Sequence, residues 1–231
     1  MYFVFDYGTY LYMDQSEIEY TGERVVPGIT PPDIYKEHTD RYIFAATLTR
    51  DKDVLDVACG TGYGTGYLAE LGARLVIGVD FSLEAVNYAY DMYGDGGEIA
   101  FLCADGVRMP FCQKAFDVVV SFETLEHIRP YRSFLAECRR VLRDNGTLVC
   151  STPNRRVFSP NIKKPLNPFH VKEFWPEEFH ELLSNYFSDI SLYGQCDVTM
   201  ADNSVERDRG VHDFTDNEQI SSGYIIAVAK K

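Results

Sequence analysis

The stretch that most constrains the fold of this chain is residues 54–66, which reads Val-Leu-Asp-Val-Ala-Cys-Gly-Thr-Gly-Tyr-Gly-Thr-Gly. The apolar run Val54–Ala58 has the length of a buried strand, and it breaks into a loop with glycine at positions 60, 62, 64 and 66 before a helical pattern resumes. Glycine reaches backbone conformations that other residues resist, and its missing Cβ lets the main chain approach a ligand. The stretch therefore predicts a strand, a turn and a helix that together hold a nucleotide.

Strand-like apolar runs alternate with helical patterns over most of the chain. Pro31 and Pro32 begin an apolar pattern at helical spacing, which predicts a leading helix over residues 31–50. Near-continuous Val and Leu runs in repeated strand–helix units indicate a parallel sheet covered on both faces. We predict an α/β fold with a Rossmann-like, doubly wound, mostly parallel seven-stranded sheet and helices on both faces. The strands are expected at residues 54–58, 75–79, 99–103, 117–121, 147–151, 190–193 and 224–229.

The length of 231 residues fits a single domain. Residues 1–30 are rich in Tyr and Phe and then in Gly and Pro, and we expect an N-terminal arm that covers either a ligand or the sheet. The sheet core is expected over residues 54–231. Residues 196–222 are polar and acidic, so we expect them to form a surface excursion from this core.

The charge and the apolar pattern exclude several classes of protein. The net charge of −13 repels a phosphate backbone, which disfavours a nucleic-acid partner. No apolar run reaches the ~18 residues of a membrane span, and the first residues lack the basic segment and cleavage site of a secretory signal. The six cysteines contain no C-x-x-C pair. We expect a cytoplasmic protein that acts on a small molecule or a sugar.

The glycine spacing and the nearby acids indicate which nucleotide the loop holds. A dinucleotide fingerprint, G-x-G-x-x-G, fails here because Thr65 or Tyr67 stands at the position of its last glycine. Asp80, at the end of the second predicted strand, suits the hydroxyls of a ribose. Asp56, just before the loop, would conflict with a pyrophosphate, but it suits the ammonium and sulfonium groups of S-adenosylmethionine.

Three motifs carry a resemblance to a known family: Val54–Gly62, Val79–Asp80 and Ala104–Asp105. They resemble the successive cofactor motifs of the class I S-adenosylmethionine-dependent methyltransferases, over nearly the whole chain from about residue 50. The resemblance implies a methyltransferase that uses S-adenosylmethionine.

The same resemblance implies a role for each motif residue. Gly60 and Gly62 would lie against the methionine portion, Asp80 would bind the ribose, Phe81 would flank the adenine, and Asp105 would accept from its amino group. The alternative is that the acids cap strand ends and that Phe81 is a core aromatic. The implied cofactor-binding residues are Asp56, Ala58, Gly60, Gly62, Asp80, Phe81, Ala104, Asp105 and Phe122.

A cluster of acids and histidine follows the fourth predicted strand. If a helix starts here, Glu123, Glu126 and His127 share one face and form a divalent metal site. Oxygen ligands favour magnesium or manganese, and the imidazole leaves zinc open. His170 is the expected fourth ligand, because the segment after the fifth strand returns over the same sheet edge. Without a metal, the acids are helix N-terminal residues, and His127 or His170 is a general base.

This constellation is similar to two metal-dependent branches of the superfamily. They are the ubiquinone-pathway O-methyltransferases and the small-RNA 3′-terminal 2′-O-methyltransferases, in which E-x-x-E-H and a later histidine hold the ion. The surroundings of His170, in Asn167–Glu173, depart from the pattern of the RNA enzymes. Residues 20–28, Ser151–Arg155 and Asn167–Glu173 also resemble methyltransferases of glycan and cell-surface sugar pathways.

These resemblances imply O-methylation of a small molecule or a sugar/glycan precursor, with His127 and His170 as catalytic residues. Metal-dependent methylation of an RNA 2′-hydroxyl and a non-catalytic, S-adenosylmethionine-binding subunit stay open as alternatives. Arg24, His38 and Arg41 are candidates for holding a phosphate or carboxylate of the substrate, with surface or capping roles as the alternative. The oligomeric state is not indicated by the sequence.

Overall fold

The computed structural model describes residues 18, 20, 22, 24–94, 96–205, 210–217 and 219–231. Most of the arm expected over residues 1–30 lies outside this part of the chain. The strands are β1 (Asp53–Val57), β2 (Leu75–Asp80), β3 (Ile99–Cys103), β4 (Phe116–Ser121), β5 (Leu142–Pro153), β6 (Ser188–Thr199), β7 (His212–Asp213) and β8 (Ile220–Lys230). The helices are α1 (Pro32–Thr49), α2 (Tyr63–Glu70), α3 (Leu83–Tyr93), the 3-10 turn η1 (Leu125–His127), α4 (Tyr131–Val141), α5 (Arg155–Phe158) and α6 (Pro176–Ser184).

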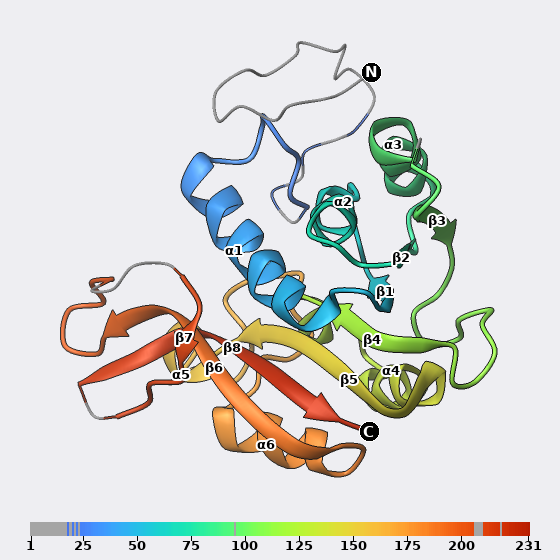
Figure 1. The fold of residues 1–231 in the computed structure, drawn as a ribbon. Coiled ribbons are helices and arrows are strands. Elements are labelled where there is room, and N and C mark those ends of the chain that lie inside the picture. Colours follow the sequence, from blue (N-terminus) through green and yellow to red (C-terminus); the bar gives the residue numbers. More distant parts are fainter. Residues whose placement is uncertain are drawn as a thin grey trace.

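The described strands form one sheet in the order β3-β2-β1-β4-β5-β8-β6-β7 (Figure 1). Strands β1 to β5 pair parallel with one another, whereas β8 pairs antiparallel with both β5 and β6. The prediction of an α/β, mostly parallel fold is confirmed. The sheet has eight strands instead of the expected seven, because β7, a strand of two residues, joins its edge.

Helices cover both faces of the sheet, with α1, α2 and α3 on one side and α4 and α6 on the other (Figure 1). Successive side chains of a strand point to opposite faces, so neighbouring residues enter different cores. Leu55 and Val119 belong to the buried cluster that includes residues of α4 and α6. Val54 and Val118 belong to the cluster that includes residues of α1 and α2. Burial on both faces explains why these strands are continuous apolar runs.

The expected surface excursion at residues 196–222 is wrong at both of its ends. Strand β6 continues to Thr199 and β8 begins at Ile220, so both ends lie within the sheet. These strands can bury polar side chains because those side chains form hydrogen bonds inside the protein. The Ser222 hydroxyl, for example, donates to the buried Asp197 carboxylate at 2.7 Å. A polar sequence therefore concealed two buried strand ends.

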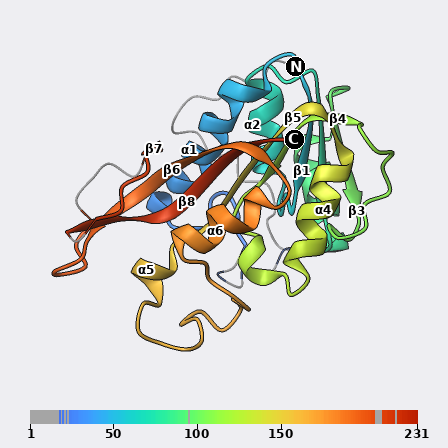
Figure 2. The same cartoon turned by 90° about the horizontal axis from the view of Figure 1, so that it is seen from below.

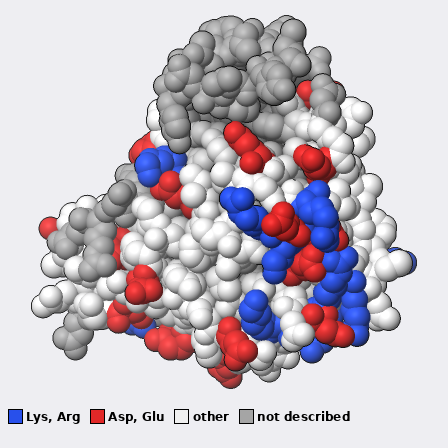
Figure 3. All heavy atoms as spheres, in the orientation of Figure 1, with Lys and Arg blue, Asp and Glu red and all other residues white. Residues whose placement is uncertain are grey.

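Opposite charges alternate at the edge where β1 and β4 begin. Arg74 and Arg143 both contact Asp53, at 2.8 and 2.9 Å, and both contact Asp117, at 3.5 and 2.8 Å. The corresponding side of the surface shows Lys and Arg interleaved with Asp and Glu (Figure 3). These basic groups are thus neutralised locally. Within the described residues, no helix is long and apolar enough to cross a membrane.

Candidate functional site

The glycine loop between β1 and α2 is shaped by close contacts beneath it. Gly60 and Gly62 have positive φ angles of 55° and 79°. A Cβ on Gly62 would lie 2.5 Å from the Cβ of Ala89 in α3 and 2.9 Å from the ring of Phe101 in β3. Only glycine fits this space and this backbone conformation. The loop therefore packs closely against α3 and β3, and a ligand can approach its main chain.

Asp56 holds the loop from inside the fold. Its side chain is fully buried, and it accepts hydrogen bonds from the hydroxyls of Thr65 in α2, at 2.7 Å, and Tyr42 in α1, at 3.2 Å. The predicted contact between Asp56 and a cofactor ammonium group does not fit a carboxyl without solvent exposure. Burial raises the pKa of Asp56 to about 7, while the two hydroxyl bonds oppose that shift.

The ends of β2 and β3 place two carboxylates and an exposed ring side by side. Asp80 accepts from the Gly60 amide at 2.9 Å, and its main-chain carbonyl accepts from the Ala104 amide at 2.9 Å. Phe81 is 80% exposed, and Asp105 is exposed as well. Both acids also accept backbone amides two residues ahead, as caps do. Capping accounts for the two acids but not for the exposure of Phe81.

The remaining predicted cofactor residues lie around this loop. Ala58 is exposed and has a positive φ of 63°, and its amide donates to the Val79 carbonyl at 2.7 Å. Phe122 is buried and packs edge-on against Tyr42, with 5.0 Å between ring centroids. The described end of the expected arm also reaches the loop, because the Thr61 hydroxyl donates to the Val25 carbonyl at 2.8 Å.

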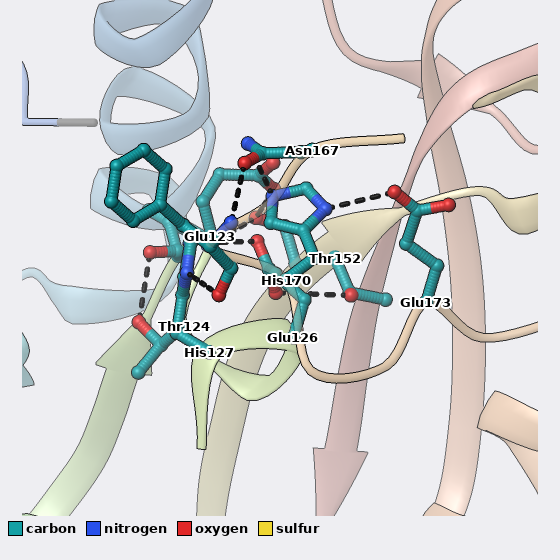
Figure 4. Close-up of polar contacts among 11 residues, drawn as sticks. Glu123, Thr124, Glu126, His127, Thr152, Asn167, His170 and Glu173 are labelled. Atoms are coloured by element: carbon teal, nitrogen blue, oxygen red, sulfur yellow. Dashed lines mark hydrogen bonds and ion pairs between the residues drawn. The ribbon is translucent and has the colours of Figure 1, made fainter. Parts of the chain in front are cut away.

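A second cluster of functional groups follows β4, the neighbour of β1. Ligand atoms of Glu126, His127 and His170 all lie within 4.8 Å of one another (Figure 4). The expected helix here is wrong, because the chain forms only the 3-10 turn η1. Glu123 precedes this turn with a positive φ of 49°, and its carboxylate accepts from the Ser151 hydroxyl at 2.6 Å. Glu123 is therefore not a member of the cluster.

Each histidine of the cluster has its Nδ1 occupied. Nδ1 of His127 lies 3.2 Å from the Phe169 carbonyl oxygen, and Nδ1 of His170 lies 2.8 Å from the Glu173 carboxylate. These oxygens can only accept, so Nδ1 carries the proton of each neutral ring. The lone pair is then on Nε2 of both rings, which pack edge to face with centroids 4.9 Å apart.

Glu126 faces His127 from the interior. Its side chain is fully buried, and one oxygen accepts from the Thr152 hydroxyl at 3.1 Å. The other oxygen lies 3.9 Å from Nε2 of His127 and has no hydrogen-bond partner among the described residues. Burial and the nearby Glu123 carboxylate raise the pKa of Glu126 well above its usual range. A proton or a cation between Glu126 and the two histidines would relieve this cost.

Of the three predicted substrate-clamping residues, Arg41 has a structural role. Arg41 is fully buried, donates to the Gln195 side chain at 2.6 Å and lies 4.8 Å from the centroid of the Tyr224 ring. It therefore ties α1 to β6 and β8. Burial and the neighbouring Arg41 lower the pKa of His38 well below its usual range. Arg24, by contrast, lies over the glycine loop, with its Cγ 3.7 Å from the position of a Cβ on Gly60.

The sequence analysis missed the residues that support the two clusters. Glu173 is buried beside His170, and its second oxygen accepts from the Ser159 hydroxyl. Tyr42 and Thr65 hold Asp56. The spacing of three residues between His170 and Glu173 was the one available signal, and it falls in a segment without a helical pattern.

Comparisons with known proteins point to the same class of protein as the sequence motifs. Residues 55–150 match a family model described as a methyltransferase domain. Over these residues the chain is therefore similar to methyltransferase domains. It is 37% identical over 169 residues to a Mycolicibacterium smegmatis protein named "Probable S-adenosylmethionine-dependent methyltransferase", covering 73% of this chain and 64% of the relative. A Mycobacterium tuberculosis protein of the same description is 36% identical over 176 residues, covering 75% and 63%. The chain thus spans just under two thirds of these relatives.

More distant proteins extend the comparison. An O-methyltransferase of Penicillium expansum is 36% identical over 99 residues, which is 42% of this chain and 36% of that protein. The solved structure of an S-adenosylmethionine-dependent methyltransferase from Archaeoglobus fulgidus superposes with a TM-score of 0.63 at 21% identity, covering 86% of this chain and 93% of that one. This structural likeness confirms the fold predicted for the domain.

We expect Gly62→Ala to weaken the binding of S-adenosylhomocysteine by about tenfold or more, because a Cβ there collides with its neighbours and strains the backbone. Titration calorimetry measures the effect. Gly97→Ala is the matched control, since a Cβ at Gly97 meets nothing within 4 Å. Equal affinities for the two variants would contradict the role of the loop.

The buried Asp56 predicts a pH-dependent stability. Between its ordinary pKa of 3.8 and its folded pKa of about 7, the unfolded chain releases a proton that the folded chain keeps. Stability therefore falls as pH rises through this range, by up to about 1.4 kcal/mol per pH unit. Asp56→Asn removes the titration, so the difference in free energy of unfolding between wild type and variant should shrink with rising pH. Denaturant unfolding at pH 5, 6 and 7 tests this, and a constant difference would refute it.

Proposed function

We propose that this protein transfers the methyl group of S-adenosylmethionine to a hydroxyl oxygen of a small molecule or a sugar. The observation that carries the proposal is the convergence of Glu126, His127 and His170 within 4.8 Å. The cluster follows β4 and the glycine loop follows β1, and these strands are adjacent and parallel. Their carboxyl ends open at one edge of the sheet, where α/β folds bind ligands.

The loop side of the edge suits the donor. In our proposal, Gly60 and Gly62 present main-chain groups to the methionine portion, Asp80 accepts from the ribose hydroxyls and Phe81 packs on the adenine. Each Asp80 oxygen already accepts one backbone amide, and a carboxylate oxygen can accept a second hydrogen bond. The sulfonium is a reactive donor, so alignment of the acceptor supplies much of the catalysis.

The histidine side of the edge suits a hydroxyl acceptor. A hydroxyl must lose its proton as its oxygen attacks the methyl group. The Nε2 lone pairs of His127 and His170 provide a base, with the proton held between imidazole and Glu126. The Asn167 side-chain nitrogen lies 3.1 Å from Nε2 of His170 and would give way to the acceptor.

The same three groups fit a divalent cation. The unpaired oxygen of Glu126 is a buried acceptor, and outer hydrogen bonds to Nδ1 are typical of histidines that ligate through Nε2. With Glu123 outside the cluster, one carboxylate and two imidazoles favour zinc or manganese over magnesium. A bound metal would supply an acidified and oriented acceptor hydroxyl.

We expect His127→Ala and His170→Ala each to lower kcat by about a hundredfold or more, as removal of a general base or a metal ligand does. Affinity for S-adenosylhomocysteine should stay within about twofold, because the two rings belong to the cluster after β4 and are held there by Phe169 and Glu173. His180→Ala, on the exposed side of α6, is the matched control. Loss of cofactor binding in the cluster variants would contradict the assignment.

Metal analysis separates the two forms of the proposal. If a cation is held, the purified protein should contain about one equivalent of zinc or manganese, and His127→Ala and His170→Ala should reduce that content. Activity should fall after chelation and return with the metal. Full activity after chelation would contradict the metal-dependent form and support a histidine that acts as a general base without a metal.

Two further measurements test the alternative functions. Label transfer from S-adenosylmethionine by the purified chain alone excludes a non-catalytic subunit. An RNA acceptor would show binding that weakens steeply with salt.

We expect Glu173→Ala to lower kcat by about tenfold to a hundredfold, because the ring of His170 loses the partner that fixes its tautomer. Glu173→Gln keeps an acceptor oxygen and should recover much of the activity. Nitrogen-15 NMR of His170 gives a readout independent of turnover, since the Nδ1-protonated form should lose its dominance in Glu173→Ala only. An unchanged His170 spectrum would contradict this role.

A further inference from the structure

The segment between β5 and α6 has a charge opposite to that of the chain. Residues 155–172, hereafter the β5–α6 segment, contain five Lys or Arg and no Asp or Glu, whereas the chain has 35 acidic against 22 basic residues. Figure 2 shows α5 and the loop that follows it projecting from the body of the protein. A basic segment thus protrudes from an acidic molecule.

The same segment exposes large apolar side chains. Leu166 is 74% exposed and Phe169 is 55% exposed, and further members of the set are more than a third exposed. Burial of such side chains is favourable by ~25 cal/mol per Å² of apolar area, so their exposure together marks a surface that meets an apolar partner. The exposed apolar residues of the segment are Phe158, Ile162, Leu166, Phe169 and Val171.

Of the five cations of the segment, Arg155 donates to the Ile162 carbonyl at 2.7 Å, and the other four divide into two groups. Arg156 and Lys172 turn toward the body of the protein, where Arg156 pairs with Glu177 at 2.9 Å and Lys172 with Glu178 at 3.6 Å. Lys163 and Lys164 are both exposed. They form no ion pair with any residue that the structure describes. Two uncompensated ammonium groups are thus flanked by Ile162 and Leu166.

We propose that the β5–α6 segment docks on an anionic lipid surface. Apolar side chains would enter the boundary between headgroups and acyl chains, and Lys163 and Lys164 would remain at the level of the anionic headgroups. The pattern favours a lipid over a nucleic acid, since three of the five exposed apolar residues, Ile162, Leu166 and Val171, are aliphatic and only Phe158 and Phe169 carry a ring on which a base could stack. Because the chain has a net charge of −13, its electrostatic attraction to an anionic lipid surface depends on this local basic segment.

Docking would place the site of methyl transfer next to the lipid. His170 belongs to the β5–α6 segment, and Phe169, which is exposed, offers its carbonyl to His127. If the proposed function holds, the acceptor is an amphiphile whose hydroxyl-bearing head is presented at the lipid surface. That extension rests on the proposed function, whereas the docking itself does not.

Vesicle binding tests the docking without any assay of activity. The probe is the full chain with vesicles of phosphatidylcholine alone or with 30 mol% (about a third) phosphatidylglycerol. Binding is followed by co-sedimentation and by the fluorescence of Trp175, the single tryptophan, which borders the segment. We expect binding to the anionic vesicles and little binding to the neutral ones.

Variants separate the segment from other surfaces. Lys163→Glu with Lys164→Glu should weaken binding to anionic vesicles by about thirtyfold or more. Ile162→Ser with Leu166→Ser should weaken it by about tenfold or more, even at low salt. The matched controls are Arg50→Glu with Lys52→Glu, near the start of β1, and Tyr90→Ser on α3, each of which should leave binding unchanged.

The outcomes distinguish failure of the docking from failure of the proposed function. Equal binding to neutral and anionic vesicles, or equal weakening by control and segment variants, would overturn the proposal. Binding of single-stranded RNA that the vesicles do not compete away, and that the Ser variants do not weaken, would assign the surface to nucleic acid. If vesicles bind while His127→Ala keeps full activity, the docking stands and the proposed function fails.

Discussion

The glycine loop between β1 and α2 depends on the hydrogen bonds of the buried Asp56 carboxyl group. One side chain receives a hydroxyl from α2, through Thr65, and a hydroxyl from α1, through Tyr42. It thereby joins the central strand to two helices directly beneath the glycine loop. The cost of a buried acid is offset by these two bonds, and the pKa of about 7 shows that the offset is partial. The loop geometry thus rests on a polar contact inside an apolar layer.

The parallel half of the fold could be predicted because its strands are buried on both faces and read as continuous apolar runs. The antiparallel end was harder, since β6 and β8 carry buried polar side chains: Ser222 donates to Asp197, and Gln195 donates to the Glu37 carbonyl in α1. A polar stretch in the sequence does not reveal whether its partners are water or other strands. The extent of those strands therefore emerged only from the three-dimensional pairing.

The candidate site, too, could be predicted only in part from the sequence. The motif order predicted a cofactor site at the glycine loop, which stays a prediction. The return of the chain after β5 brought His170 to His127, as expected for a doubly wound sheet. The helix expected at Glu123 did not form, because the backbone turns through a left-handed conformation at that residue. Glu173 and Ser159 could not be found, since their roles arise from contacts and not from a pattern.

Strand β8 lies between β5 and β6, antiparallel to both. The pairs that join β5 to β8, such as Thr147 with Lys230 and Thr152 with Ile225, are separated by more than seventy positions in the chain. During synthesis, β1 to β5 can assemble from nearer segments, but the outer edge of β5 must wait for β8. Until then β5 presents an open, apolar edge able to pair with another chain. Slow, late closure of the sheet is therefore built into its topology.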